Sequence, residues 1–147
     1  KAYNPSTVRN YEVHTFSCDP GKDIIIGKDA TLIPMKYDDN PSDSLIIQSD
    51  GSIKIGKNVN RIMISACCSL PIINSFQLRR LNLFRNNVSQ SRVIFSGDSY
   101  QHFSIPFKSI NVQEDDIISL KMEGSIENSC YVSANKEVTW MTIVIIG

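Results

Sequence analysis

The sequence has no excess of charge of either sign, because 15 Lys and Arg residues are balanced by 15 Asp and Glu residues. Neither sign runs in blocks along the chain. A basic surface is what binds the phosphate backbone of nucleic acids, so we do not expect nucleic acid to be the main partner. No apolar run approaches the roughly 20 residues that a membrane-spanning helix needs, and we expect no insertion into a membrane.

Cysteine is scarce, and its four copies lack the spacing of a metal site. Cys67 and Cys68 are adjacent in a segment that is typical of a strand, so their side chains point to opposite faces. A zinc site would show paired C-x-x-C motifs or a Cys/His cluster. We expect free buried thiols; a disulfide that involves Cys18 or Cys130, or a metal, are the alternatives.

Catalytic motifs are also missing: the sequence contains no G-x-S-x-G, Walker A loop, G-x-G-x-x-G or H-E-x-x-H. Its two histidines, His14 and His102, stand in no nucleophile motif, and we expect both to be solvated or hydrogen-bonded locally. The acidic runs Asp38-Asp39 and Glu114-Asp115-Asp116 are typical of solvated turns. An acid/base pair is one alternative, and calcium at Asp38-Asp39-Asn40 is another. We therefore expect neither an enzyme nor a cofactor.

What the sequence does contain is a series of short apolar runs, repeated about every 8–12 residues and separated by turn residues, which is typical of a β-sandwich. β-Branched residues, isoleucine above all, favour strands over helices. The expected strands are 24–26, 31–35, 45–48, 52–55, 61–70, 76–85, 92–95, 102–110, 116–123, 130–133 and 139–146. We expect one domain, with residues 1–22 as an N-terminal arm or linker and residues 23–147 as an all-β head. The abrupt start at Lys1 indicates a fragment of a longer protein.

The final run, from Trp140 to Ile146, has apolar residues at both its odd and its even positions, and so on both faces of a strand. A half-buried strand alternates apolar and polar residues, so this strand needs cover on both faces. Met141, Ile143 and Ile145 suit a sandwich core. The opposite face needs a second layer, and in so short a chain we expect another copy of the chain to supply it.

In one predicted hairpin arginines flank a turn at Asn86-Asn87, and we expect an ordinary solvated strand face there. The alternative is a polar patch that binds an anionic or sugar ligand. Exposed Arg, Asn and aromatic side chains can hydrogen-bond to a sugar and stack on it. The candidate ligand-binding residues are Arg79, Arg85, Asn86, Asn87 and Tyr100.

Three stretches resemble the jelly roll of the tumour-necrosis-factor (TNF) and complement globular-head superfamily, especially the versions on bacteriophage fibres and other virion appendages. They are Ile110–Lys121, similar to that family's penultimate strand; Val138–Ile143, similar to its last strand; and Ser49–Ala66, similar to a strand–turn–strand passage of the phage examples. Together they cover roughly residues 45–146. Where the family usually has Gly-Asp before the penultimate strand, this sequence has Asp115-Asp116.

The resemblance implies a TNF-like jelly-roll β-sandwich that forms a homotrimer, in which the last strand packs near a threefold axis. Aromatic residues are enriched and charges depleted in the cores of interfaces. We therefore expect a trimer interface at Trp140, Thr142, Val144, Met63 and Ser65.

The resemblance also implies the head of a virion fibre or tail protein that attaches to a host-cell surface glycan or receptor. The chain would then be located on the virion, outside the host cell. One alternative is a structural domain, without a ligand of its own, that drives trimerisation or decorates a capsid. Another is a secreted TNF-like receptor ligand.

Overall fold

The computed structural model describes residues 11–18, 24–26, 29–70, 77–97, 101–124, 130–133 and 135–146. All of its regular elements in that part of the chain are strands. In chain order they are β1 (Tyr11–Cys18), β2 (Ile24–Ile26), β3 (Thr31–Leu32), β4 (Met35–Tyr37), β5 (Leu45–Ile47), β6 (Ile53–Ile55), β7 (Arg61–Leu70), β8 (Gln77–Arg85), β9 (Val88–Gly97), β10 (Gln101–Asn111), β11 (Ile117–Gly124), β12 (Cys130–Val132) and β13 (Trp140–Ile146). No helix in the described residues is long and apolar enough to span a membrane.

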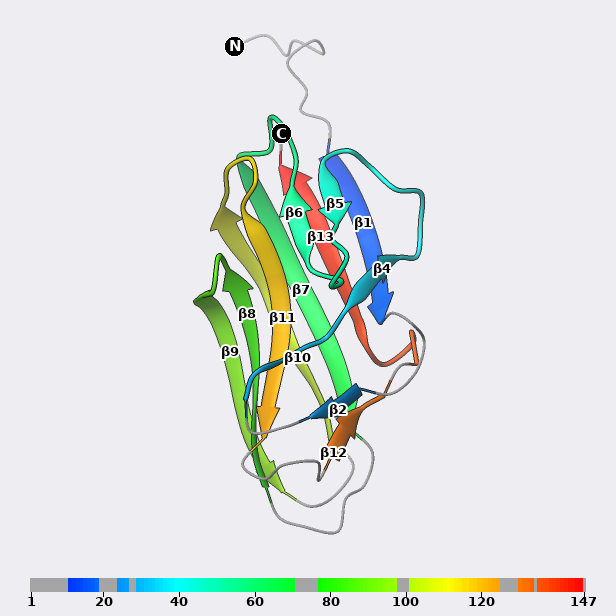
Figure 1. The fold of residues 1–147 in the computed structure, drawn as a ribbon, viewed down its shortest axis with the longest axis vertical. Coiled ribbons are helices and arrows are strands. Elements are labelled where there is room, and N and C mark those ends of the chain that lie inside the picture. The colour runs from blue at the N-terminus through cyan, green and yellow to red at the C-terminus, as the bar shows by residue number, and fades with distance from the viewer. Residues whose placement is uncertain are drawn as a thin grey trace, which may run out of the picture.

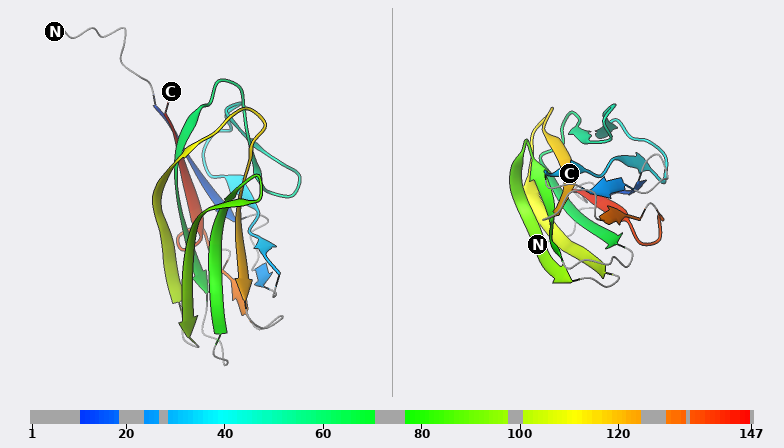
Figure 2. Two further views of the ribbon diagram at one scale, coloured as in Figure 1. Left: turned by 90° about the vertical axis from the view of Figure 1, so that its left-hand side faces the viewer. Right: turned by 60° about the horizontal axis from the view of Figure 1, so that its bottom comes forward.

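Two antiparallel sheets lie face to face (Figures 1 and 2). The first sheet has the order β10-β7-β13-β1-β4, and the second the order β5-β6-β11-β8-β9 with β3 also paired to β11. A short β12-β2 pair stands apart from both. In the left view of Figure 2, β10 and β13 lie in the left-hand layer, while β11 lies in the right-hand one. This all-β double layer is the predicted sandwich.

The core lies between the sheets and is formed by alternate residues of each strand, as the two-residue period of a strand requires. On β7, Ile62 and Ile64 are fully buried. On β13, Met141, Ile143 and Ile145 are buried, while the residues between them are only half-buried. The predicted division of β13 into a core face and an outer face is therefore confirmed.

The interpretation of residues 1–22 as an arm was wrong for residues 11–18. These residues form β1, which is paired along its length with β13 and, near its end, with β4. Breakers at Pro5 and Pro20 on either side obscured the alternation within this stretch, in which His14, Phe16 and Cys18 are buried. Residues 1–10 and 19–23 lie outside the described part of the chain.

Two local irregularities have simple physical causes. Pro106 lies where the pairing of β10 with β7 shifts register, between Ile105 and Lys108, and β10 is an edge strand. A proline is tolerated in a sheet only at such places. The bulge also breaks the alternation, so Ile105 is buried whereas Phe107 is exposed and does not share its face.

The turn before β11 explains why Asp115-Asp116 can replace the family's Gly-Asp. Asp115 has a φ of +70°, in the left-handed region that glycine adopts without strain. Aspartate and asparagine tolerate this region better than other non-glycine residues. The same property forms the β8–β9 turn, where Asn86 and Asn87 have φ values of +49° and +64°. Positive φ at both central residues is typical of a tight two-residue hairpin.

Candidate functional site

The outer face of the first sheet contains the residues that were predicted to form an interface. In the register of the sheet, Val144 lies opposite Met63 of β7, and Thr142 lies opposite Ser65. Trp140 begins the same row, opposite Cys67. The structure thus brings all five predicted residues onto two neighbouring strands. Ser65 is buried and donates a hydrogen bond to the Ile105 carbonyl, so its hydroxyl also ties β7 to β10.

β1 extends this face on the other side of β13, and the sequence analysis missed its contribution. Val13 lies opposite Val144, and Tyr11 opposite Ile146. Tyr11 is 63% exposed and Val13 is 55% exposed, although both are large apolar side chains. We call Tyr11, Val13, Met63, Val144 and Ile146 the apolar face. A contiguous exposed patch of this kind on a small domain indicates an interaction surface.

A thiol and an imidazole meet at the other end of the first sheet. His102 Nε2 lies 3.0 Å from Cys67 Sγ, and His102 Nδ1 lies 3.3 Å from Ser69 Oγ. Burial raises the pKa of the Cys67 thiol, which is only 3% exposed. A catalytic cysteine has the opposite properties, a lowered pKa and access to substrate. Cys67 and Cys68 are free thiols that point to opposite faces, as predicted, and Cys68 lies in the core.

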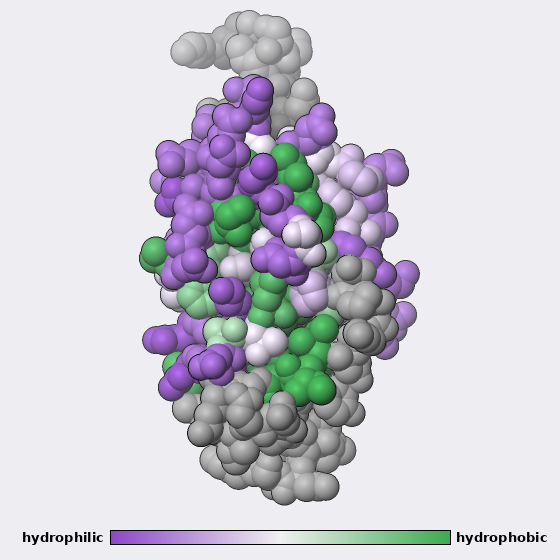
Figure 3. Space-filling model, viewed as in Figure 1, coloured by the Kyte–Doolittle hydropathy of each residue, from purple (hydrophilic) through white to green (hydrophobic). Residues whose placement is uncertain are grey.

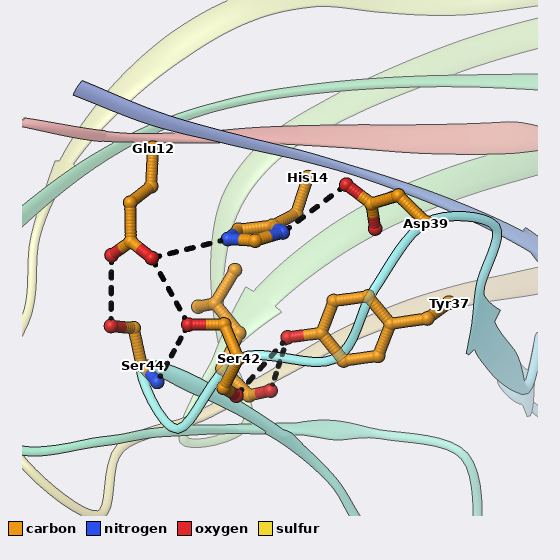
Figure 4. A network of polar contacts seen from close by, with 7 residues as sticks. Glu12, His14, Tyr37, Asp39, Ser42 and Ser44 are labelled. Atoms are coloured by element: carbon orange, nitrogen blue, oxygen red, sulfur yellow. Dashed lines mark hydrogen bonds and ion pairs between the residues drawn. The ribbon is translucent and has the colours of Figure 1, made fainter.

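A polar network joins β1 to the loop between β4 and β5 (Figure 4). His14 is buried, with its ring edge-on to Tyr37, and its Nδ1 lies 3.3 Å from Asp39 Oδ2. Glu12 accepts hydrogen bonds from Ser42 and Ser44, and the bond from Ser44 is the main reason its pKa is lowered. His14 is thus buried, and it pairs with Glu12, two residues away, at 3.5 Å as well as with the distant Asp39.

The Asp38-Asp39 pair, weighed as a calcium site, belongs to the same region. Asp38 accepts a 2.6 Å hydrogen bond from Ser17, while Asp39 pairs with His14. Among the described residues, no three His, Cys, Asp or Glu side chains gather as a metal-binding group. These carboxylates hold the loop onto β1.

Among the predicted ligand-binding residues, Arg85, Asn86 and Asn87 lie together at the β8–β9 turn. Arg79 is only 1% exposed, and Tyr100 lies outside the described residues. Arg85 Nε and the Asn86 amide both donate to Asp116, at 2.6 Å and 2.8 Å. Arg79 is therefore buried, Arg85 and Asn86 hold Asp116, and Asn87 is exposed at the same turn.

Asp116 is the centre of that structural cluster. Its carboxylate is 3% exposed and also accepts the Gln113 backbone N–H at 2.9 Å. Burial raises the pKa of Asp116, but the hydrogen bonds from Gln113, Asn86 and Arg85 outweigh it, and the net pKa is lowered. The cluster fastens the β8–β9 turn to the turn before β11.

Asn87 borders a hollow on the outer face of the second sheet, the face seen in Figures 1 and 3. Its volume is about 430 Å³, and its walls come from β11, the β5–β6 turn, the β8–β9 turn and the segment that crosses β11 at β3. Figure 3 shows that this face mixes polar surface with apolar patches, which lie over β2 and the β5–β6 region. The lining residues are Ala30, Leu32, Asp50, Ser52, Asn86, Asn87, Ile117, Ser119 and Lys121.

No family model matches this sequence, and no curated protein matches it. The structure, however, matches crystal structures of murine APRIL at pH 5.0 and at pH 8.5, with TM-scores of 0.69 and 0.70 and 13% identity over 93% of this chain and 100% of that chain. It also matches Eiger TNF from S. frugiperda, with a TM-score of 0.67 and 8% identity over 95% of this chain and 94% of that chain.

The chain has the TNF-like jelly-roll fold. This confirms the predicted fold class, which rested on short stretches of the C-terminal two thirds. The likeness extends over 93% of the chain, more than the residues 45–146 that the sequence resemblance covered. At 8–13% identity the likeness concerns the fold and not the site.

Proposed function

We propose that this chain is a self-associating binding head without enzymatic activity: a homotrimer whose first sheet faces the threefold axis and whose outward surfaces attach to a cell-surface structure. The observation that carries the proposal is the apolar face. β13 is buried on one side, and on the other its Val144 and Ile146 align with exposed Val13 and Tyr11. Trp140, Thr142, Val144, Met63 and Ser65 are its expected interface residues.

A closed trimer requires a second, different surface on each protomer, because the contacts of a threefold ring run head to tail. The edge formed by β9 and β10 is suited to this role. The two strands lie side by side at the ends of their respective sheets, and they expose Ile94 and Phe107. The apolar face of one protomer would then receive the β9–β10 edge of the next.

The attachment role follows from the geometry of such a trimer. Three weak sites on one rigid head gain avidity without any new contact. The finer proposal, derived from the sequence resemblance, is the tip of a virion fibre or tail that binds a host-cell glycan or receptor. A secreted receptor ligand is the second candidate, favoured by the fold shared with Eiger TNF. The buried free thiols Cys67 and Cys68 weigh against it, because secreted domains tend to pair their cysteines.

The first experiment measures solution mass by light scattering on a size-exclusion column. Wild type should have three times the 16.5 kDa mass of one chain. Val144→Glu should be monomeric, because it would bury an unpaired charge at the interface. The control is Ile25→Glu, at an exposed apolar position on β2 outside both proposed surfaces. A monomeric wild type would refute the proposal.

Head-to-tail geometry has its own test. Phe107→Glu should also be monomeric when alone. Mixed with Val144→Glu, it offers an intact apolar face to the intact β9–β10 edge of the other variant, so the mixture should give heterodimers and no trimers. A symmetrical face-to-face contact would instead leave Phe107→Glu fully associated.

A further inference from the structure

The hollow on the outer face of the second sheet is not used by self-association, because it lies on the opposite layer from the apolar face. Its size, about 430 Å³, is within the range of small-molecule sites. Three of its lining side chains, Leu32, Ile117 and Ala30, are apolar, and the rest are polar. A few convergent polar groups beside an apolar surface are typical of a binding site.

Asp50 supplies an acceptor. Its Oδ1 receives both the backbone N–H and the hydroxyl of Ser52, at 2.9 Å and 2.6 Å. These bonds, above all the one from the Ser52 hydroxyl, lower the pKa of Asp50 and keep it ionised at neutral pH. Its second oxygen, Oδ2, accepts none of the hydrogen bonds found among the described residues. Ser52 therefore holds the carboxylate in place through Oδ1, while Oδ2 can accept a hydrogen bond from a ligand.

Lys121 and Asn87 supply donors. The Lys121 ammonium lies 5.4 Å from the centre of the Phe84 ring and 3.4 Å from Asn87 Oδ1, contacts that hold a flexible side chain at the hollow. The amide nitrogen of Asn87 makes no hydrogen bond within the described part of the chain. Asn86, in contrast, donates from its amide nitrogen to Asp116 and accepts the Ile117 N–H with its amide oxygen. It therefore lines the hollow without contributing a donor to a ligand.

We infer that this hollow binds a neutral saccharide unit, whose hydroxyls donate to Asp50 Oδ2 and accept from Lys121 Nζ and Asn87 Nδ2, with its C–H face on Leu32 and Ile117. One carboxylate and one ammonium cancel in charge, so neither a strongly anionic nor a cationic ligand is favoured. A hydroxyl can both donate and accept, which matches a site that presents both kinds of partner. The inference rests on the proposed attachment role and gives it a location.

Two neighbouring hollows are less suited to such a ligand. One is lined by Lys54, Lys57, Glu114 and Asp115 and is dominated by charge. The other, beside β4 and β5, has mainly apolar walls that include Met35, Leu45 and Ile47. Neither combines an open carboxylate oxygen with fixed amide and ammonium donors.

The test is an amide-resolved NMR titration with the methyl glycosides of glucose, galactose, mannose and N-acetylglucosamine, each to about 50 mM. At least one should shift the amides of Asn87, Ser119 and Lys121 in a saturable way, with a dissociation constant on the order of 1–10 mM, as expected for a ligand of this size. Sodium sulfate is titrated in parallel. Sulfate as the only binder, no saturable shift at 50 mM, or shifts elsewhere on the surface would each overturn the inference.

The variants are chosen to leave the fold intact. Lys121→Met keeps the aliphatic stem on Phe84, and Asn87→Gly keeps the positive φ of the turn. Each should weaken binding at least about tenfold, because each removes a donor to the ligand. Their matched controls, Lys54→Met and Asn58→Gly, change a lysine outside this hollow and another asparagine at positive φ, and should bind like wild type. Unaltered binding by Lys121→Met and Asn87→Gly would contradict the site.

The same titration on monomeric Val144→Glu separates this inference from the proposed trimer. All the residues of the hollow come from one protomer, so the binding constant per site should be unchanged. Binding by a protein that never trimerises would refute the trimer alone, and a trimer without saccharide binding would refute the site alone.

Discussion

Asp116→Asn should destabilise the fold through the hydrogen bonds it disrupts. Three donors converge on the Asp116 carboxylate: Asn86 Nδ2 at Oδ1, and Arg85 Nε and the Gln113 N–H at Oδ2. An asparagine offers one oxygen and one NH₂ group, so at least one buried donor must face another donor.

The magnitude follows from that geometry. One unsatisfied buried partner costs about 1–3 kcal/mol, and loss of the charge weakens the remaining bonds further. The Arg85 side chain is 33% exposed, and solvent screening therefore reduces the contribution of its bond to Asp116. We expect the free energy of unfolding to fall by about 2–3 kcal/mol at pH 7.

The matched control is Asp115→Asn at the adjacent position. The Asp115 side chain is 75% exposed and has only a 3.9 Å ion pair with Lys54. Asparagine also suits its φ of +70°, so the change should be within about 0.5 kcal/mol of zero. The assay is urea unfolding at one fixed protein concentration, because association would otherwise alter the apparent stability. Equal stability of the two variants would refute the reasoning.

The pH dependence gives a second readout on the same variants. The pKa of Asp116 is lower in the folded protein than in the unfolded chain, where it is about 3.9. Its stabilisation is therefore present above that value and is lost as the pH falls through the folded-state pKa. The stability gap between wild type and Asp116→Asn should narrow below about pH 4. A gap that stays constant down to pH 2 would exclude the carboxylate as its source.

Two further predictions concern close packing and burial. Gly51→Ala should lower the free energy of unfolding, measured by thermal unfolding, by at least about 1–3 kcal/mol. The reason is that φ is +90° at Gly51 and that a Cβ there would lie 2.3 Å from the Pro34 Cβ. Ser49→Ala, at an exposed position in the same turn, is the control, and an equal loss of stability in both variants would contradict this account. Cys67 should not react with a thiol reagent in the native protein at pH 8, because burial raises its pKa and blocks access; rapid labelling that disappears in Cys67→Ser would show that the thiol is exposed.

The candidate interface was predictable from the sequence in part. Apolar residues on both parities of β13 already required two covering layers, since any burial of one face leaves the other exposed. Val13 and Tyr11 could not be added, because their strand is joined to β13 only by pairing between the two ends of the chain. The alternation of buried and exposed residues in 11–18 could have predicted this strand, but the prolines at positions 5 and 20 favoured the interpretation as an arm.

The candidate ligand site was less predictable. Asn86 and Asn87 are adjacent and chemically identical, and both line the hollow. Both amide atoms of Asn86 are engaged by Asp116 and the Ile117 N–H, whereas the amide nitrogen of Asn87 makes no hydrogen bond within the described residues. Arg79 and Arg85 were expected at the surface because arginine is rarely buried. Asp50 and Lys121 gave no signal at all, since they lie in separate turns and strands with ordinary polar neighbours.

The sequence alone determined the all-β class, most of the strands, the turn positions and the face of β13 that enters the core, because these depend on residue periodicity and on the local φ preferences of Asn, Asp, Gly and Pro. The tertiary structure decided which polar side chains hydrogen-bond to hold the turns together and where the hollow lies. It also decided that Tyr11–Cys18 is a strand of the first sheet. The physical reason is that these features are contacts between residues far apart in the chain, whose partners no local pattern specifies.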